Sequence, residues 1–203
     1  MLDKTIIKQA DVVLLGYPLM WSMSDDIRRN NLLTYERLTR ADGPAMTWSM
    51  HSIGFLDLND YEKADSNFQR SYASYVRAPF NVWTETQSGI GAVNFLTGIG
   101  GFLQAVVFGY GGLRLKIDQI EIKPTGHLPN QATKFVLYGI KYQGDILDLT
   151  INANSTYEIF VREQNPNSTV PLAYQHGQDR GILKLNDRLS YPINTLLIIR
   201  PSP

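Results

Sequence analysis

The chain has 203 residues, of which 43% are hydrophobic and 19% are charged, and its nineteen basic residues balance its nineteen acidic ones. This composition excludes a disordered, collagen-like or coiled-coil protein. A net charge of zero favours neither nucleic acid nor an anionic membrane as a partner. The chain holds no cysteine, which excludes disulfides, thiolate metal sites and a cysteine nucleophile.

The beginning of the chain does not have the pattern of a secretory leader. Residues 1–4 lack a clean basic region, and the apolar stretch that follows is broken by Gly16 and Pro18. A regular apolar pattern starts within the first few residues, whereas domains usually begin with a more dispensable segment. We therefore expect a cytoplasmic protein, and we expect Met1 to lie inside the domain of a larger protein.

The first half of the chain predicts helices. Ser24 precedes two aspartates, which is typical of a helix start, and the helix should run to about Arg40. Residues 44–58 predict a second helix. Residues 59–62 resemble a capping box, and apolar residues spaced by three and four predict a third helix that ends before Ala78. Those apolar residues are Tyr61, Ala64, Phe68, Tyr72 and Val76.

The segment from Ile90 to Leu113 carries no charge and is long enough to cross a bilayer. It also contains Asn94, Gln104 and seven glycines, which favour a buried helix of a soluble domain, so no membrane partner is expected. Three small residues four apart predict a helix face that packs closely on a neighbour: Gly101, Ala105 and Gly109.

After Arg114 the pattern changes to that of strands. Alternating or β-branched segments are separated by glycine and asparagine turns, and they predict five to seven short antiparallel strands in a sandwich-like domain. The segments are 117–122, 135–142, 146–151, 157–161 and 196–199. We place the domain boundary near residue 115, with a helical domain over 1–115 and a β-domain over 116–203.

The usual motifs of metal and nucleotide sites are missing. The three histidines, His51, His127 and His176, lie far apart in the sequence, so no metal site is predicted. There is no Walker loop or nucleophile elbow, and the glycines at 98–101 lack the preceding strand of a dinucleotide loop.

Two polar clusters stand beside apolar segments. Lys8 and Asp11 precede a run of aliphatic residues; they could form an ion pair at a helix edge, or Lys8 and Gln9 could face a polyhydroxylated ligand. Glu85 lies beside Trp83 among short polar residues, as an ionisable group beside an aromatic platform for sugar chemistry would. Spacing alone favours a surface loop with a partly exposed tryptophan.

Residues 8–13 (KQADVV) resemble a signature of glycoside hydrolase family 65. Further segments are similar to the acid-trehalase-like branch of that family, in the same order: 43–50 (GPAMTWSM), 82–85 (VWTE), 91–98 (GAVNFLTG) and 100–109 (GGFLQAVVFG). The resemblance runs from about Ile6 to Arg114 and is weak beyond. Several separated motifs in one order make chance an unlikely source of the match.

The resemblance implies an α+β chain, with the C-terminal helices of an (α/α)6 barrel followed by an antiparallel β-sandwich-like domain. It also implies that Lys8 and Gln9 bind the non-reducing glucose and that Glu85 is the general base, with no metal or cofactor. The general acid would lie on an upstream barrel segment missing from this chain, so the chain alone should be inactive.

The favoured interpretation is the C-terminal portion of an inverting α-glucosidase that acts on glucosyl-galactosyl-hydroxylysine or a related α-glucoside. One alternative is a disaccharide phosphorylase of the same family. His51 and Ser52 favour it weakly, since phosphorylases use such a pair for phosphate, whereas the charge of Glu85 would repel phosphate. The other alternative is a truncated, non-catalytic sugar-binding fragment.

Overall fold

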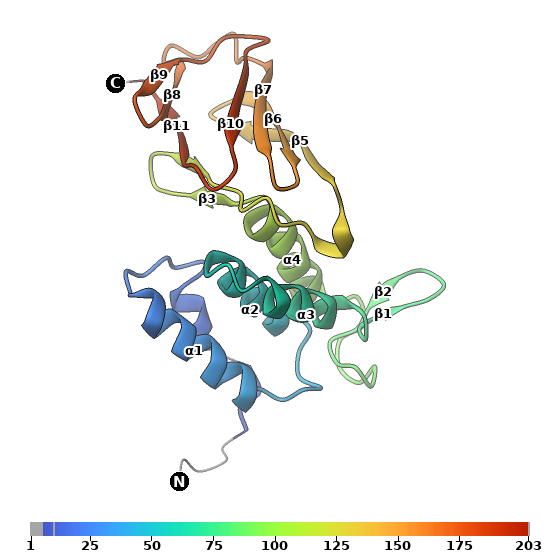
Figure 1. Cartoon of the computed structure of the whole chain (residues 1–203). Helices are drawn as coiled ribbons and strands as arrows, with labels where there is room; N and C mark the ends of the chain where they lie inside the picture. The colour runs from blue at the N-terminus through green and yellow to red at the C-terminus, as the bar shows by residue number, and fades with distance from the viewer. Residues whose placement is uncertain (1–5, 10, 203) are drawn as a thin grey trace. The chain divides into compact units, whose positions relative to one another are not determined.

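The computed structural model describes residues 6–9 and 11–202 (Figure 1). The expectation about a leader at residues 1–4, and Ala10 of the first motif, lie outside this range. The chain divides into two compact units, one up to Gly109 and one from Tyr110 onward. This division falls before the predicted boundary near residue 115, because strand β3 (Leu113–Leu115) pairs with β4 (Ile120–Ile122) in the second unit.

The first unit contains the helices. They are α1 (Asp25–Leu38), α2 (Met46–Asp57), α3 (Tyr61–Tyr72), α4 (Leu96–Gln104), the short 3-10 helix η1 (Asp11–Leu15) and the π-helix η2 (Ala105–Tyr110), which ends at the first residue of the second unit. The helix start at Ser24 is confirmed, since Ser24 Oγ accepts a hydrogen bond from Ile27 N at 3.3 Å. The helix start within residues 59–62 is also confirmed, but its cap is Asp60, one residue after the first residue of the predicted capping box, and Asp60 Oδ1 accepts from Lys63 N at 3.5 Å. These caps satisfy N–H groups that have no partner within the helix.

Helix α2 lies at the centre of the first unit and contacts α1, α3 and α4. Its residues from Thr47 to Leu56 are all buried. The small residues predicted to pack closely do so against this helix: a Cβ at Gly101 would lie 3.3 Å from Ser49 Oγ, and one at Gly109 would lie 3.0 Å from Leu56 Cδ1. Glycine at these positions therefore lets the backbone approach α2.

Two predicted helices end or begin elsewhere. Helix α3 ends at Tyr72, and Val76 lies instead on the short strand β1 (Val76–Arg77), which pairs with β2 (Val82–Trp83). The uncharged segment becomes helical only at Leu96, because the residues before it form a bridge between Thr84 and Val93. Within the described part of the chain, no helix combines the length and the apolar character needed to cross a membrane.

The second unit contains two antiparallel sheets. One has the strand order β10-β7-β6-β5 and the other the order β3-β4-β11-β8-β9. Its other strands are β5 (Lys134–Tyr142), β6 (Asp145–Asn152), β7 (Thr156–Glu163), β8 (Leu172–His176), β9 (Asp179–Ile182), β10 (Arg188–Pro192) and β11 (Leu197–Pro201). A short 3-10 helix, η3, covers Pro129–Gln131. Figure 1 shows β5, β6 and β7 as neighbouring strands.

The two sheets face each other. His176 of β8 stacks on Tyr191 of β10 with ring centroids 3.9 Å apart, and the hydroxyl of Tyr191 donates to Asp179 Oδ2 of β9 at 2.8 Å. Alternate residues of the central strands are buried between the sheets, as in β6 and β7: Leu147, Leu149, Ile151, Tyr157, Ile159 and Val161.

Helices followed by antiparallel sheets confirm the predicted α+β class. The expected strand number was too low, because the described residues of the second unit form nine strands. Strands β3, β8, β9 and β10 were missed. Strand β3 has only three residues, β8 and β9 lack a clean alternation, and β10 alternates over only five residues and ends in proline.

Candidate functional site

Lys8 is held by the segment that packs on the end of α1. Ile7 N donates to Leu38 O at 3.0 Å, Arg40 N donates to Ile7 O at 2.9 Å, and Ile7 pairs with Thr39 in a parallel bridge. This pairing fixes the backbone beside Lys8, while the Lys8 side chain stays exposed.

Glu85 is held from both sides of its backbone. It comes two residues after β2, its N–H donates to Ala92 O at 3.0 Å, and its carbonyl accepts from Ala45 N at 3.0 Å. One carboxylate oxygen, Oε2, also accepts from Ala92 N at 3.1 Å. Glu85 is therefore anchored to the start of α2 and to the segment before α4.

These two segments bring Lys8 and Glu85 together. Lys8 Nζ lies 3.9 Å from Glu85 Oε1, and the side chains are 70% and 24% exposed, respectively. The carboxylate is thus partly shielded by protein yet open to solvent, and a cation faces the oxygen that Ala92 leaves free. A carboxylate in this setting can accept a proton from water, and the ammonium can donate hydrogen bonds to hydroxyl groups.

The third predicted residue does not join them. Gln9 is half-buried, and its Nε2 donates to Asp11 Oδ1 at 3.3 Å. The ion pair that spacing suggested between Lys8 and Asp11 is wrong, because Lys8 pairs with Glu85. The structure therefore brings Lys8 and Glu85 into contact, whereas the side-chain hydrogen bond of Gln9 is to Asp11.

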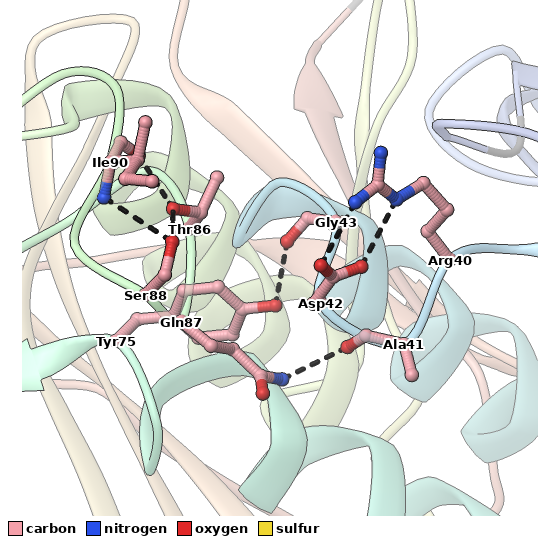
Figure 2. A network of polar contacts seen from close by, with 9 residues as sticks. All are labelled: Arg40, Ala41, Asp42, Gly43, Tyr75, Thr86, Gln87, Ser88 and Ile90. Carbon is pink, nitrogen blue, oxygen red and sulfur yellow. Dashed lines mark hydrogen bonds and ion pairs between the residues drawn. The ribbon is translucent and has the colours of Figure 1, made fainter.

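A network of polar contacts joins the loop after Glu85 to the loop after α1 (Figure 2). Gln87 Nε2 donates to Ala41 O at 2.9 Å, and the hydroxyl of Tyr75 donates to Gly43 O at 2.8 Å. Arg40 and Asp42 form an exposed ion pair at 2.9 Å, and the hydrogen bond from Arg40 lowers the pKa of Asp42. The loop after Glu85 is thereby connected to the loop after α1, and the start of that loop pairs through Thr39 and Arg40 with the segment that carries Lys8.

Trp83 is buried in the core, not partly exposed as predicted. It is 9% exposed and belongs to a buried cluster with Ala45, Trp48 and Tyr75. Its ring centroid lies 5.4 Å from that of Phe102 in α4. The prediction of a partly exposed tryptophan in a surface loop is therefore wrong, and so is the idea of Trp83 as a sugar platform. Its ring packs in the core behind Glu85.

His51 and Ser52 lie inside α2 and are both fully buried. Burial lowers the pKa of His51 to about 4, the nearby Glu36 opposes this change, and Arg70 and Lys63 add to it. His51 is therefore neutral at pH 7 and inaccessible, so this pair does not support phosphate binding. Among the described residues there is no group of three histidine, aspartate or glutamate side chains placed to hold a metal ion.

Sequence reasoning missed the groups that hold Glu85 in place. Ala92 supplies a backbone N–H, and Gly91 leaves room for the carboxylate, since a Cβ there would lie 2.6 Å from Glu85 Oε2. Gly43 likewise leaves room for the backbone of Lys8, because a Cβ at Gly43 would lie 2.9 Å from Lys8 O. The glycines inside the two motifs were the available signal, but a glycine does not reveal which atoms approach it.

The chain is similar to known glycoside hydrolases. No family model matches it. It is 45% identical over 166 residues to protein-glucosylgalactosylhydroxylysine glucosidase of Danio rerio, a match that covers 82% of this chain and 25% of that protein. It is 36% identical over 170 residues to the acid trehalase of Emericella nidulans, covering 78% of this chain and 16% of the trehalase. The chain thus spans a quarter or less of these two relatives.

A solved structure shares the fold. A putative kojibiose phosphorylase from the human microbiome superposes with a TM-score of 0.65 over 92% of this chain and 23% of its own length, at 20% identity. An identity this low supports the shared fold and not a shared reaction. Identity of 45% to a glucosidase and 36% to an acid trehalase, together with this fold, places the chain in the glycoside hydrolase family 65 group, in the acid-trehalase-like branch that its motifs predicted.

Proposed function

We propose that this chain supplies the general base and part of the glucose site of an inverting α-glucosidase. Glu85 is the base, and Lys8 and Gln9 bind the non-reducing glucose. The observation that carries the proposal is the 3.9 Å separation between Lys8 Nζ and Glu85 Oε1, since these residues come from motifs far apart in the sequence. A substrate-binding cation and a catalytic carboxylate have to share one site.

The chemistry assigned to Glu85 requires an accessible carboxylate. In an inverting hydrolase, water attacks the anomeric carbon while one of its protons passes to the base, and the glycosidic bond breaks as an acid protonates the leaving oxygen. The Glu85 side chain is 24% exposed, so the carboxylate is within reach of solvent. The general acid is expected elsewhere in the protein, with the two carboxyl groups about 6.5–9.5 Å apart.

The substrate class follows from the named relatives. The relative from Danio rerio is named for glucosylgalactosylhydroxylysine, and the relative from Emericella nidulans for trehalose. Both names describe a glucoside, so we assign an α-glucoside to this site and favour the glucosyl-galactosyl-hydroxylysine unit, because identity to the first relative is higher. A phosphorylase is not favoured, since His51 and Ser52 are buried.

The stereochemistry of the product and one substitution test the proposal. In the enzyme made with any upstream sequence that its gene encodes, an α-glucoside should release β-glucose first, as seen by NMR of fresh product. Glu85→Gln keeps the shape but cannot accept the proton, and should lower kcat by about 10²–10⁴. The control Glu62→Gln changes an exposed glutamate on α3 and should retain activity. Release of α-glucose first, or normal turnover by Glu85→Gln, would contradict the proposal.

A further inference from the structure

The segment that follows Glu85 folds back onto its carboxylate. Thr84 forms an antiparallel bridge with Val93, and Glu85 N donates to Ala92 O at 3.0 Å. This pairing places Ala92 N 3.1 Å from Glu85 Oε2. The same short loop therefore carries the carboxylate and the backbone N–H group that binds it.

Gly91 lies directly against this carboxylate. Its φ is +102°, a conformation that L side chains rarely adopt. A Cβ built on Gly91 would lie 2.6 Å from Glu85 Oε2 and 3.1 Å from Glu85 Cδ. No real Cβ makes a contact as short as 2.6 Å, so a side chain at this position would displace the carboxylate.

We infer that Gly91 is a positioning residue for the general base, an inference that rests on the role proposed for Glu85. Gly91 lets Oε2 reach Ala92 N, and this hydrogen bond turns Oε1 toward Lys8 and solvent. The two oxygens then have separate roles: Oε2 orients the carboxylate, and Oε1 accepts the proton.

The loop has its own supports, so the steric clash of an added side chain falls on Glu85. Thr86 Oγ1 donates to Ile90 O at 2.5 Å, and Gln87 Nε2 donates to Ala41 O (Figure 2). The atom nearest to the added methyl group is the carboxylate oxygen at the far end of a flexible side chain, and the Glu85 Cβ lies 3.2 Å away. The carboxylate moves more easily than these backbone contacts break. Gly91→Ala should therefore displace the base while the loop stays folded.

The same loop offers a matched control. Gly89 also has a positive φ, +81°, but a Cβ there would meet no atom within 4 Å. Alanine at either glycine strains the backbone, and only alanine at position 91 meets Glu85. A misplacement of about 1 Å can cost a reaction about 10²-fold. Gly91→Ala should therefore lower kcat about 10²-fold with little change in KM, and Gly89→Ala should keep kcat within about threefold of wild type.

A double-substitution cycle separates positioning from general damage. In a Glu85→Gln background, which has no base to misplace, Gly91→Ala should cost little further activity. An equal loss in both backgrounds would overturn the inference, as would equal kcat values for Gly91→Ala and Gly89→Ala. A crystal structure of Gly91→Ala should show the carboxylate moved away from Ala92 N, and an unmoved carboxylate would also overturn it.

The same variants also test the stability of the fold and the role proposed for Glu85. A Gly91→Ala protein that melts well below Gly89→Ala would assign Gly91 to folding and overturn a positioning role. Normal turnover by Glu85→Gln would refute the proposed function itself. Loss of activity in Glu85→Gln with full activity in Gly91→Ala would refute only the inference about Gly91.

Discussion

Lys8 Nζ lies 3.9 Å from Glu85 Oε1, while the other oxygen of the same carboxylate accepts a hydrogen bond from Ala92 N. The separation is longer than a direct hydrogen bond of about 2.7–3.2 Å, so the contact between the two side chains is electrostatic. The N–H groups of Lys8 therefore remain available to a ligand. This arrangement suits a residue that binds substrate beside a base.

Lys8→Ala should weaken glucoside binding more than it lowers the chemical step. The substitution removes a donor to the sugar and leaves the carboxylate held by Ala92, so we expect KM to rise about tenfold, a loss of about 1.4 kcal/mol. Stability should hardly change, because exposed ion pairs contribute about 0–1 kcal/mol. Steady-state kinetics and a thermal melt check both, with Lys184→Ala, an exposed residue of the second unit, as control. An unchanged KM would remove Lys8 from the binding site.

Two glycines of α4 should respond in opposite directions to alanine. A Cβ at Gly98 would lie 2.8 Å from Ala45 Cβ and 2.9 Å from Trp83 Nε1, whereas one at Gly100 would meet no atom within 4 Å. Gly98→Ala should destabilise the protein by about 1–3 kcal/mol through overpacking. Gly100→Ala should stabilise it by about 0.5–1 kcal/mol, because alanine favours the helix. Urea unfolding of both variants measures the difference, and effects of the same sign would contradict this account of the packing.

His51 should make the protein less stable in weak acid. Burial lowers its pKa from 6.5 to about 4, while Glu36, Arg70 and Lys63 act on it from α1 and α3. Between those two pH values the unfolded chain binds a proton that the folded chain excludes, so stability is complete above pH 6.5 and falls toward pH 4. The loss is up to about 3 kcal/mol.

Unfolding free energies measured from pH 7 to pH 4 check this expectation. His51→Gln cannot titrate and should flatten the profile in that window. Glu36 acts in a lower window: burial alone would raise its pKa, but hydrogen bonds from Lys63 and Asn67 lower it below 4.5, so its contribution is lost only in stronger acid. A wild-type profile that is flat from pH 6.5 to pH 4 would show that His51 is already protonated in the fold.

The segment from Ile90 to the first residue of α4 exposes large apolar side chains. Ile90, Val93 and Leu96 are 75%, 63% and 76% exposed. Exposed apolar patches promote association, so we expect the expressed chain to bind a hydrophobic dye and to self-associate. A variant with serine at these three positions should bind less dye. The comparison is a variant with serine at three exposed positions of the second unit: Tyr138, Ile182 and Leu185. A monodisperse wild-type chain that binds no dye would contradict the expectation.

Local signals in the sequence determined much of the fold. The cap at Ser24 and the helix start within residues 59–62 were predictable because a cap depends only on a side chain and a backbone N–H three residues later. The strands at β5, β6 and β7 were predictable because their segments are rich in β-branched or aromatic residues and are separated by glycine and asparagine turns. The order of the family motifs likewise needs only the sequence.

Tertiary packing decided the rest. Trp83 and Glu85 are two residues apart, yet one is buried beside Trp48 and the other is open to solvent, and no local pattern distinguishes them. Lys8 meets Glu85 and not the nearby Asp11 because backbone pairing to the end of α1 and to Ala45 places the two segments side by side. Sequence could name Lys8 and Glu85 by resemblance. Their separation, and the need for glycine at position 91, follow from contacts between segments that only the folded chain brings together.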